Sequence, residues 1–293
     1  MNTASKARTT GLNSAPAGLA ANDSIHKIRA KQPGPKLYET DADRYVGPQR
    51  WQTQWWARLA RRAWRHRAYT RWVRQACTEL TVRGSSHLQA VDTPCIFIAN
   101  HQSHLDTLVV YESLPERIRR RLFFGAAQDR WFLKGQKKTV LKPWYQSLVL
   151  GNFPVMRGGG ADALSYATEL LQQGEHVFLF PEGTRATGES LGEFRHGVAL
   201  LATRLGVPVV PIYLSGLKAL QPKGSREVVP GPVAIEFLEP QCFTAETSVP
   251  AATAMLHSAM NAAHRCANAN TPSLPKTGAD GSVSVDPDVP QAA

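Results

Sequence analysis

The chain has 293 residues, 43% of them hydrophobic and 19% charged, which excludes a collagen-like or wholly disordered protein and is enough to bury the core of one large domain. Four widely spaced cysteines without a CxxC pair exclude a disulfide scaffold and a cysteine-rich zinc module, and they fit a reducing compartment. The net charge of +11 sits in the first 78 residues, with 15 basic and 4 acidic residues against 19 of each in residues 79–293, which predicts an anionic partner for the N-terminal part.

Both ends of the chain have the composition of disordered tails. Residues 1–48 are rich in Ala, Ser, Thr, Pro and Gly without a sustained apolar period, and residues 269–293 are similar and mildly acidic. The first 50 residues also lack the apolar core of a signal peptide. No apolar run in the chain reaches the roughly 18 residues that a membrane-spanning helix needs.

Residues 49–77 form a basic segment with five tryptophans and no carboxylate. At 100° per residue an apolar face and an arginine face lie opposite each other, but the apolar face rotates after Ala68. We therefore expect two short amphipathic helices with a break near residues 64–67. The apolar face carries Trp51, Trp55, Trp56 and Leu59, and the basic face carries Arg58, Arg61, Arg62 and Arg65.

Short apolar runs alternate with helical patterns through residues 78–268, which we expect to form one domain. The pattern predicts an α/β fold with a largely parallel sheet flanked by helices. The expected strands are 78–84, 95–99, 122–126, 153–156, 176–180, 207–214 and 233–238. The main expected helices are 105–114, 161–173, 194–205 and 253–266.

The segment Asn100–Asp106 (NHQSHLD) directly follows an expected strand, where the sites of α/β proteins lie. His101 is suited to act as a general base, and a carboxylate such as Asp106 can orient its ring. The alternative is a capping box with Ser103 as the N-cap of the next helix. The two histidines beside Asp106 also suggest a metal, but no third ligand stands at a suitable spacing, so we expect no metal site.

Three further segments end at turns that suit a site. Phe180–Arg185 (FPEGTR) offers Thr184 and Arg185 to an anion, and its plainer interpretation is an ordinary turn. Pro154–Gly160 runs from a strand into glycines whose amides can receive a phosphate at a helix start, or it is a flexible loop. Val207–Ile212 (VPVVPI) on its own is a buried strand.

Taken together and in this order, the four segments resemble the blocks of the glycerolipid acyltransferase superfamily, which includes the 1-acylglycerol-3-phosphate acyltransferases. NHxSxxD stands at 100–106, a strand ending in arginine at 153–157, FPEGTR at 180–185 and VPVxP at 207–211. The resemblance covers about residues 80–240. It implies transfer of an acyl group from acyl-CoA or acyl carrier protein to a lysophospholipid. The thioester is a co-substrate, and no further cofactor is expected. The leading acceptor is 1-acylglycerol-3-phosphate, which would give phosphatidic acid.

The resemblance also implies a role for each residue. His101 would take the proton of the acceptor hydroxyl, and Asp106 would orient His101. The phosphate of the acceptor would be held by Arg157, Thr184 and Arg185 in a pocket that Glu182 and Gly183 shape, and Pro211 would lie on the acyl-donor side. One departure is that residues 125–132 lack the lysine of the family's AKxEL-like segment. Another head group, such as that of lysophosphatidylethanolamine, therefore stays open, with Asp129 facing its cationic group.

A lysolipid acceptor lies in a bilayer, so we expect the Trp- and Arg-rich helices to bind an anionic membrane surface rather than a nucleic acid. The alternative is that they pack their tryptophans against the core. The expected location is the cytoplasmic face of a bacterial inner membrane. The basic runs 117–121 and 134–138 either receive an acyl carrier protein or are solvated. A thioesterase or transacylase and a non-catalytic adaptor remain the rival functions.

Overall fold

The computed structural model describes residues 44–269 except 90, 158–161, 186–187, 189, 223–224 and 226. Most of the two expected tails and the glycines 158–160 lie outside the described residues. Residues 44–48 were expected to belong to the first tail, but they join the body. The N–H of Val46 donates to the carbonyl of Phe132 at 2.8 Å, and the N–H of Lys134 donates to that of Arg44 at 3.1 Å.

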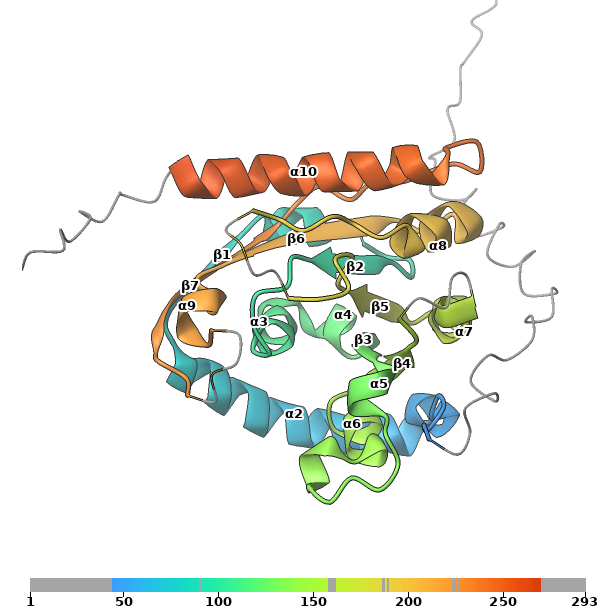
Figure 1. Ribbon diagram of the computed structural model, residues 1–293, viewed down its shortest axis with the longest axis vertical. Helices are drawn as coiled ribbons and strands as arrows, with labels where there is room; N and C mark the ends of the chain where they lie inside the picture. The colour runs from blue at the N-terminus through green and yellow to red at the C-terminus, as the bar shows by residue number, and fades with distance from the viewer. Residues whose placement is uncertain are drawn as a thin grey trace, which may run out of the picture.

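One sheet forms the centre of the molecule, with the strand order β1-β7-β6-β2-β5-β3-β4 (Figure 1). Every neighbouring pair is parallel except β6–β7, so the predicted largely parallel sheet is confirmed. The strands are β1 (Cys77–Arg83), β2 (Ile96–Ala99), β3 (Leu122–Ala127), β4 (Asn152–Val155), β5 (His176–Leu179), β6 (Val209–Ser215) and β7 (Gly231–Phe237). Each falls at a predicted strand.

Helices cover both faces of the sheet because the apolar side chains of the central strands alternate between two clusters. Ile96 and Ile98 pack with α7 (Ser165–Gln172), α8 (Gly197–Leu205) and α10 (Val249–Ala269) on one face. Phe97 and Ala99 pack with α2 (Trp55–Ala76), α3 (Asp106–Ser113) and α4 (Glu116–Arg119) on the other. The short helices α5 (Gln128–Trp131), α6 (Pro143–Leu148) and α9 (Leu217–Leu220) lie in the connections.

Helix α2 differs from the predicted helical pair in its continuity, and from the alternative interpretation in leaving its tryptophans exposed. It is one continuous helix of 22 residues after a short 3₁₀ turn, so the expected break near residues 64–67 is wrong. Its tryptophans are not packed against the core: Trp55 is 75% exposed and Trp56, Trp64 and Trp72 are about half exposed. The buried side instead carries Ala57, Arg61, Arg65, Tyr69, Val73 and Ala76.

The two buried arginines explain why this face of α2 packs against the domain. Arg61 donates to the carbonyls of Gln52, Ser147 and Leu148 at 2.9–3.1 Å, and Arg65 donates to those of Val149 and Leu150. Several of these are orphan carbonyls at the C-terminal end of α6, where the helix dipole is negative. Arg61 and Arg65 thus bind protein backbone, and our expectation that they face lipid phosphates is wrong.

Candidate active site

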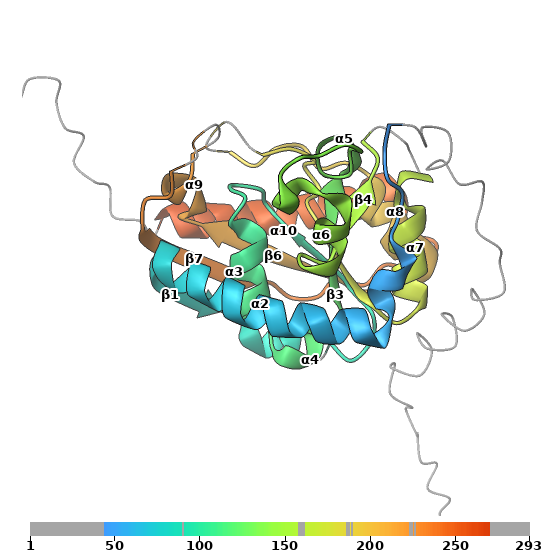
Figure 2. The same cartoon turned by 90° about the horizontal axis from the view of Figure 1, so that it is seen from below.

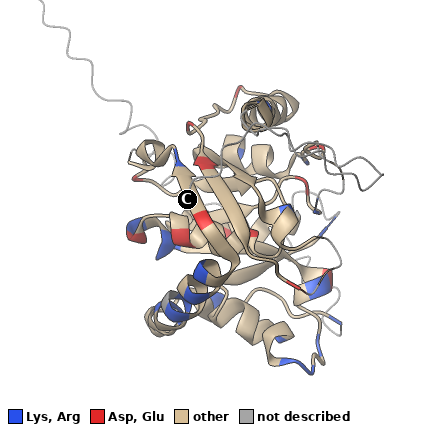
Figure 3. Ribbon diagram, turned by 90° about the vertical axis from the view of Figure 1, so that its left-hand side faces the viewer, with Lys and Arg blue, Asp and Glu red and all other residues tan. Residues whose placement is uncertain are grey.

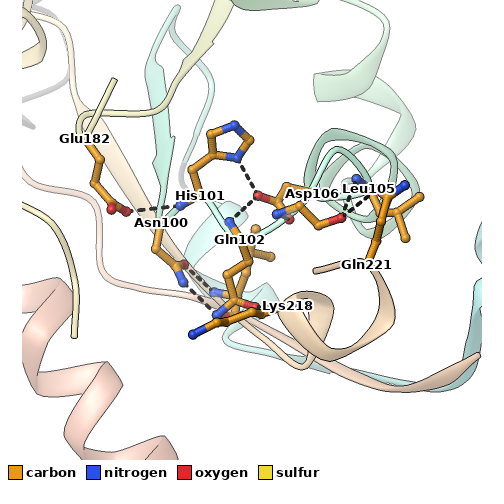
Figure 4. Close-up of polar contacts among 10 residues, drawn as sticks. Asn100, His101, Gln102, Leu105, Asp106, Glu182, Lys218 and Gln221 are labelled. Carbon is orange, nitrogen blue, oxygen red and sulfur yellow. Dashed lines mark hydrogen bonds and ion pairs between the residues drawn. The ribbon is translucent and has the colours of Figure 1, made fainter. Parts of the chain in front are cut away.

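The loop between β2 and α3 brings His101 and Asp106 together (Figure 4). Their Nδ1 and Oδ2 atoms are 2.8 Å apart. The same Oδ2 accepts the N–H of Gln102 at 2.7 Å, and Oδ1 accepts that of Ser103 at 2.9 Å. Asp106 is the first residue of α3, so Ser103 is not the N-cap, and its Oγ accepts the N–H of Leu105. One carboxylate therefore caps the turn and orients the imidazole.

Within the pair, Asp106 is more deeply buried than His101. Asp106 is fully buried, and burial raises its pKa, while the hydrogen bonds from His101, Ser103 and Gln102 act in the opposite direction. The ring of His101 stacks on that of Phe180, with centroids 3.9 Å apart and planes 18° apart. Its side chain is 18% exposed. With Nδ1 engaged by Asp106, Nε2 is the ring nitrogen left to exchange a proton.

Glu182 connects the FPEGTR segment to this loop. Its Oε1 accepts the N–H of His101 and its Oε2 accepts that of Gly192, both at 3.1 Å. Burial raises the pKa of Glu182, and the two N–H groups oppose that shift. This carboxylate thus holds the dyad loop through the backbone, and the expected role of Glu182 and Gly183 in shaping a phosphate pocket stays a prediction. Gly183 has φ +70°, and a Cβ there would lie 2.8 Å from Nε of Arg195.

Side chains of the NHQS segment hold the loop to the end of β6. Asn100 exchanges two hydrogen bonds with the backbone of Leu214, at 2.8 and 2.9 Å, and Gln102 donates to the same carbonyl at 3.0 Å. Ser103 Oγ donates to Gln221 at 3.2 Å, a partner that no motif in the sequence indicated. Pro211 is a buried member of β6 paired with Ile98, and its role on the acyl-donor side stays a prediction.

A cationic group lies beside the dyad. Arg130 from α5 places Nη2 3.2 Å from Nε2 of His104. The pKa of His104 is lowered to about 4, first by burial and then by the charges of Arg185, Arg130 and His101. Arg185 is half-buried and Thr184 is exposed. Our sequence analysis missed Arg130, although it belongs to the segment whose lysine is absent, so that segment supplies a cation from another position.

Arg157 lies in an ion pair that the sequence did not indicate. Its Nε and Nη2 donate to the two carboxylate oxygens of Asp129 at 3.1 and 2.5 Å. Both side chains are nearly half exposed. We expected Arg157 to hold a phosphate and Asp129 to face a cation, and in this structure the two satisfy each other. Neither is unpaired, so an acceptor head group would have to compete with the pair or bind both of its members.

Comparison with known proteins identifies relatives over the same region. The sequence profile of the Acyltransferase family matches residues 79–215, which include the dyad loop, FPEGTR and β6. A chloroplastic 1-acyl-sn-glycerol-3-phosphate acyltransferase of Brassica napus is 34% identical over 153 residues, covering 50% of this chain and 40% of the relative. The human 1-acyl-sn-glycerol-3-phosphate acyltransferase alpha is 32% identical over 168 residues, covering 54% and 53%. The chain spans about half the length of these curated relatives.

A solved structure has the same fold. The crystal structure of the 1-acyl-sn-glycerophosphate acyltransferase from Thermotoga maritima aligns with a TM-score of 0.57 at 21% identity. The alignment covers 87% of this chain and 97% of that one. At this identity the match concerns the fold, and it extends beyond the region that the family profile covers.

Proposed function

We propose that the protein transfers a fatty acyl group from an acyl thioester to the free hydroxyl of a lysophospholipid, since residues 79–215 match the profile of the Acyltransferase family. The leading acceptor is 1-acylglycerol-3-phosphate, which would give phosphatidic acid. The observation that carries the proposal is the 2.8 Å contact between His101 and Asp106 at the carboxyl end of a central strand. The names of the curated relatives support the same acceptor.

The proposed reaction needs no nucleophilic residue because the thioester is already activated. Nε2 of His101 takes the hydroxyl proton of the acceptor as the hydroxyl oxygen attacks the thioester carbonyl. Asp106 stabilises the imidazolium that forms. The C–S bond then breaks, the ester remains on the acceptor, and the thiolate of CoA or of the acyl carrier protein receives the proton from His101.

The cations beside the dyad support a phosphate-bearing acceptor. Arg185 and Arg130 are close enough to each other for Arg130 to lower the pKa of Arg185, after the larger effect of burial. Two such guanidiniums can share one phosphate through charge-assisted hydrogen bonds. We assign them to the acceptor phosphate, with Thr184 beside Arg185 as a further donor. Arg157 is a weaker candidate since Asp129 already engages it.

The Arg157–Asp129 pair favours a second candidate, a zwitterionic lysolipid such as lysophosphatidylethanolamine. Its phosphate and ammonium could replace the internal pair, with the phosphate on Arg157 and the ammonium on Asp129. Replacing Asp129 by Ala distinguishes the two. If the preference between lysophosphatidic acid and lysophosphatidylethanolamine is the same in wild type and Asp129→Ala, the second candidate is discarded.

We further propose that the protein is peripheral to a membrane, at the cytoplasmic face of a bacterial inner membrane. None of the helices in the described part of the chain is long and apolar enough to cross a bilayer. Helix α2 and the neighbouring α6 lie on one side of the molecule (Figures 1 and 2). Both expose tryptophans: Trp55, Trp56, Trp64 and Trp72 on α2 and Trp144 on α6. Such side chains suit the interface between head groups and acyl chains.

The proposed function is tested by supplying labelled acyl-CoA or acyl carrier protein and a panel of lysolipids in liposomes. We expect label in phosphatidic acid, with 1-acylglycerol-3-phosphate the preferred acceptor and one of the two thioesters as donor. Release of free fatty acid without any acylated lipid would support a thioesterase instead. Labelled lipid in the absence of a thioester would indicate a transacylase. A folded, membrane-bound protein that modifies none of the acceptors would contradict the proposal.

A further inference from the structure

A groove of about 830 Å³ lies between the first half of α2, α4 and the residues leading into β3. Among the described residues that line it, eight are arginines and one, Glu116, is a carboxylate. In Figure 3 the basic segments gather at the lower left, where α2 is seen nearly end-on below α4. The arginines are Arg58, Arg61, Arg62, Arg65, Arg67, Arg119, Arg120 and Arg121.

The charge of these arginines is only partly balanced. Glu116 pairs with Arg62 at 2.9 Å and with Arg120 at 2.7 Å. Glu175, beneath the groove, pairs with Arg58 at 2.5 Å and lies 3.9 Å from Arg121. Arg61 and Arg65 are buried and donate to backbone carbonyls, so two carboxylates face the six other guanidiniums. The pKa of Arg61 is lowered to about 9 by burial and, next, by the charges of Arg65 and Arg58, which reflects the local excess of positive charge.

The groove is separate from the site of the proposed acyl transfer. Arg121 immediately precedes β3 and Glu175 immediately precedes β5, so the groove lies at the amino ends of these parallel strands. His101 follows β2, at the carboxyl end of the same sheet. In Figure 2, α4 is at the lower edge and α5 at the upper edge. A carrier protein bound at the groove would be at the wrong end to present its thioester to His101.

We propose that this groove binds the phosphate group of an anionic phospholipid. Guanidinium groups bind phosphate oxygens in pairs and remain charged at neutral pH, and a groove of this volume is in the range of ligand sites. Trp55 and Leu59 line the same groove and are 75% and 61% exposed, so they offer an apolar wall to the acyl chains of the lipid. This lipid site rests on the proposed attachment of α2 to a membrane, but it uses no step of the proposed reaction.

The test compares two triple variants of the full chain that remove the same charge. Arg62, Arg67 and Arg120 all become Gln in the groove variant, while Arg71, Arg74 and Arg83, exposed and outside the groove, become Gln in the control. Co-sedimentation is measured with phosphatidylcholine vesicles with and without phosphatidylglycerol. We expect the groove variant to lose about tenfold or more in affinity for the anionic vesicles and the control to lose much less. Equal losses, or no loss in the groove variant, would overturn the proposal.

A second measurement separates the two sources of phosphate. Calorimetric titration uses a water-soluble short-chain phosphatidylglycerol and, separately, glycerol 3-phosphate. Loss of lipid binding in the groove variant alone would support a phospholipid site. If glycerol 3-phosphate binds as well as the lipid, the proposal of a lipid ligand is overturned and the ligand is a soluble phosphate ester. Binding of neither overturns the site. Acyl transfer to a lysolipid in detergent micelles should be equal in both variants. A failure of the proposed lipid site can therefore be distinguished from a failure of the proposed reaction.

Discussion

Oδ2 of Asp106 accepts two hydrogen bonds at once, from Nδ1 of His101 at 2.8 Å and from the N–H of Gln102 at 2.7 Å. The imidazole and the turn that carries it are therefore positioned by the same atom. A carboxylate, which only accepts hydrogen bonds, can do this with all its partners donating. An amide cannot, because its NH₂ group would face a donor.

Asp106→Asn is expected to lower kcat for acyl transfer by roughly 10²–10⁴-fold, because the imidazole loses its orientation and its counter-charge. Steady-state transfer from acyl-CoA measures the effect, and circular dichroism verifies folding. Asp92→Asn, at a side chain that is 87% exposed, serves as the control and should retain wild-type activity. A kcat for Asp106→Asn within a few-fold of wild type would remove Asp106 from the mechanism.

Glu182→Gln tests whether the FPEGTR segment positions the dyad loop. The amide can accept only one of the N–H groups of His101 and Gly192, so we expect kcat to fall roughly 5- to 150-fold with a smaller change in KM. The neighbouring exposed Glu193→Gln is the matched control. An effect on the KM of the acceptor alone would mean that Glu182 acts on substrate binding instead of on the loop.

Arg130→Ala and Arg185→Ala test the assignment of these cations to the acceptor phosphate. Losing a charge-assisted hydrogen bond of about 1.5–3 kcal/mol raises the KM for 1-acylglycerol-3-phosphate roughly 10- to 150-fold. The rate with a phosphate-free acceptor, 1-acylglycerol, should change little. If both acceptors lose activity equally, the two arginines act on the dyad or on the fold rather than on the phosphate.

Arg65→Met tests the role of the buried arginine in α2. The variant leaves the carbonyls of Val149 and Leu150 without their donor, so we expect the free energy of unfolding to fall by about 2 kcal/mol or more. Urea denaturation of wild type, Arg65→Met and the exposed Arg71→Met measures it. Arg71→Met should lie within about 0.5 kcal/mol of wild type. Equal stability of all three proteins would show that Arg65 is dispensable to the fold.

The buried His176 makes stability depend on pH. Its Nδ1 accepts the N–H of Cys95, and its pKa is lowered from 6.5 to about 4, by burial and then by Arg121 and Arg117. In the unfolded chain His176 is protonated below about pH 6.5, whereas in the folded chain it stays neutral until about pH 4. The free energy of unfolding should therefore fall as pH drops from 6.5 towards 4, by about 3 kcal/mol from this group.

His176→Gln isolates that contribution, since glutamine can still accept a hydrogen bond but does not titrate. Urea unfolding at several pH values between 7 and 4 compares the variant with wild type. The variant should show the shallower dependence on pH. Parallel curves would mean that His176 does not carry the linkage.

The strands and the dyad were predictable because each depends on residues close together in the chain. Apolar runs such as Ile96–Ala99 in β2 and residues 177–179 in β5 suit strands that are buried on both faces. His101 and Asp106 are five residues apart, so one turn is enough to join them. The order of the four motif segments then indicated a resemblance to the acyltransferases, and the profile of the Acyltransferase family matches residues 79–215.

The features that sequence analysis missed depend on partners far away in the chain. Arg61 and Arg65 of α2 are buried because carbonyls more than 80 residues later need donors, and no periodicity in α2 reveals these carbonyls. Arg157 meets Asp129 across 28 residues, and Arg130 meets His104 across 26. Arg61, Arg65, Arg157 and Asp129 were expected to face a membrane or a substrate, and no role was expected of Arg130. The tertiary structure supplied a partner for each of them.

The most direct test of the proposed reaction is whether His101 activates the acceptor hydroxyl. Wild type and His101→Gln are each incubated with acyl-CoA and 1-acylglycerol-3-phosphate in liposomes. The release of free thiol and the formation of phosphatidic acid are measured in the same sample. We expect equal amounts of free thiol and phosphatidic acid from wild type, and a loss of both by at least about 10²-fold in the variant. A folded His101→Gln protein that forms phosphatidic acid at the wild-type rate would contradict it.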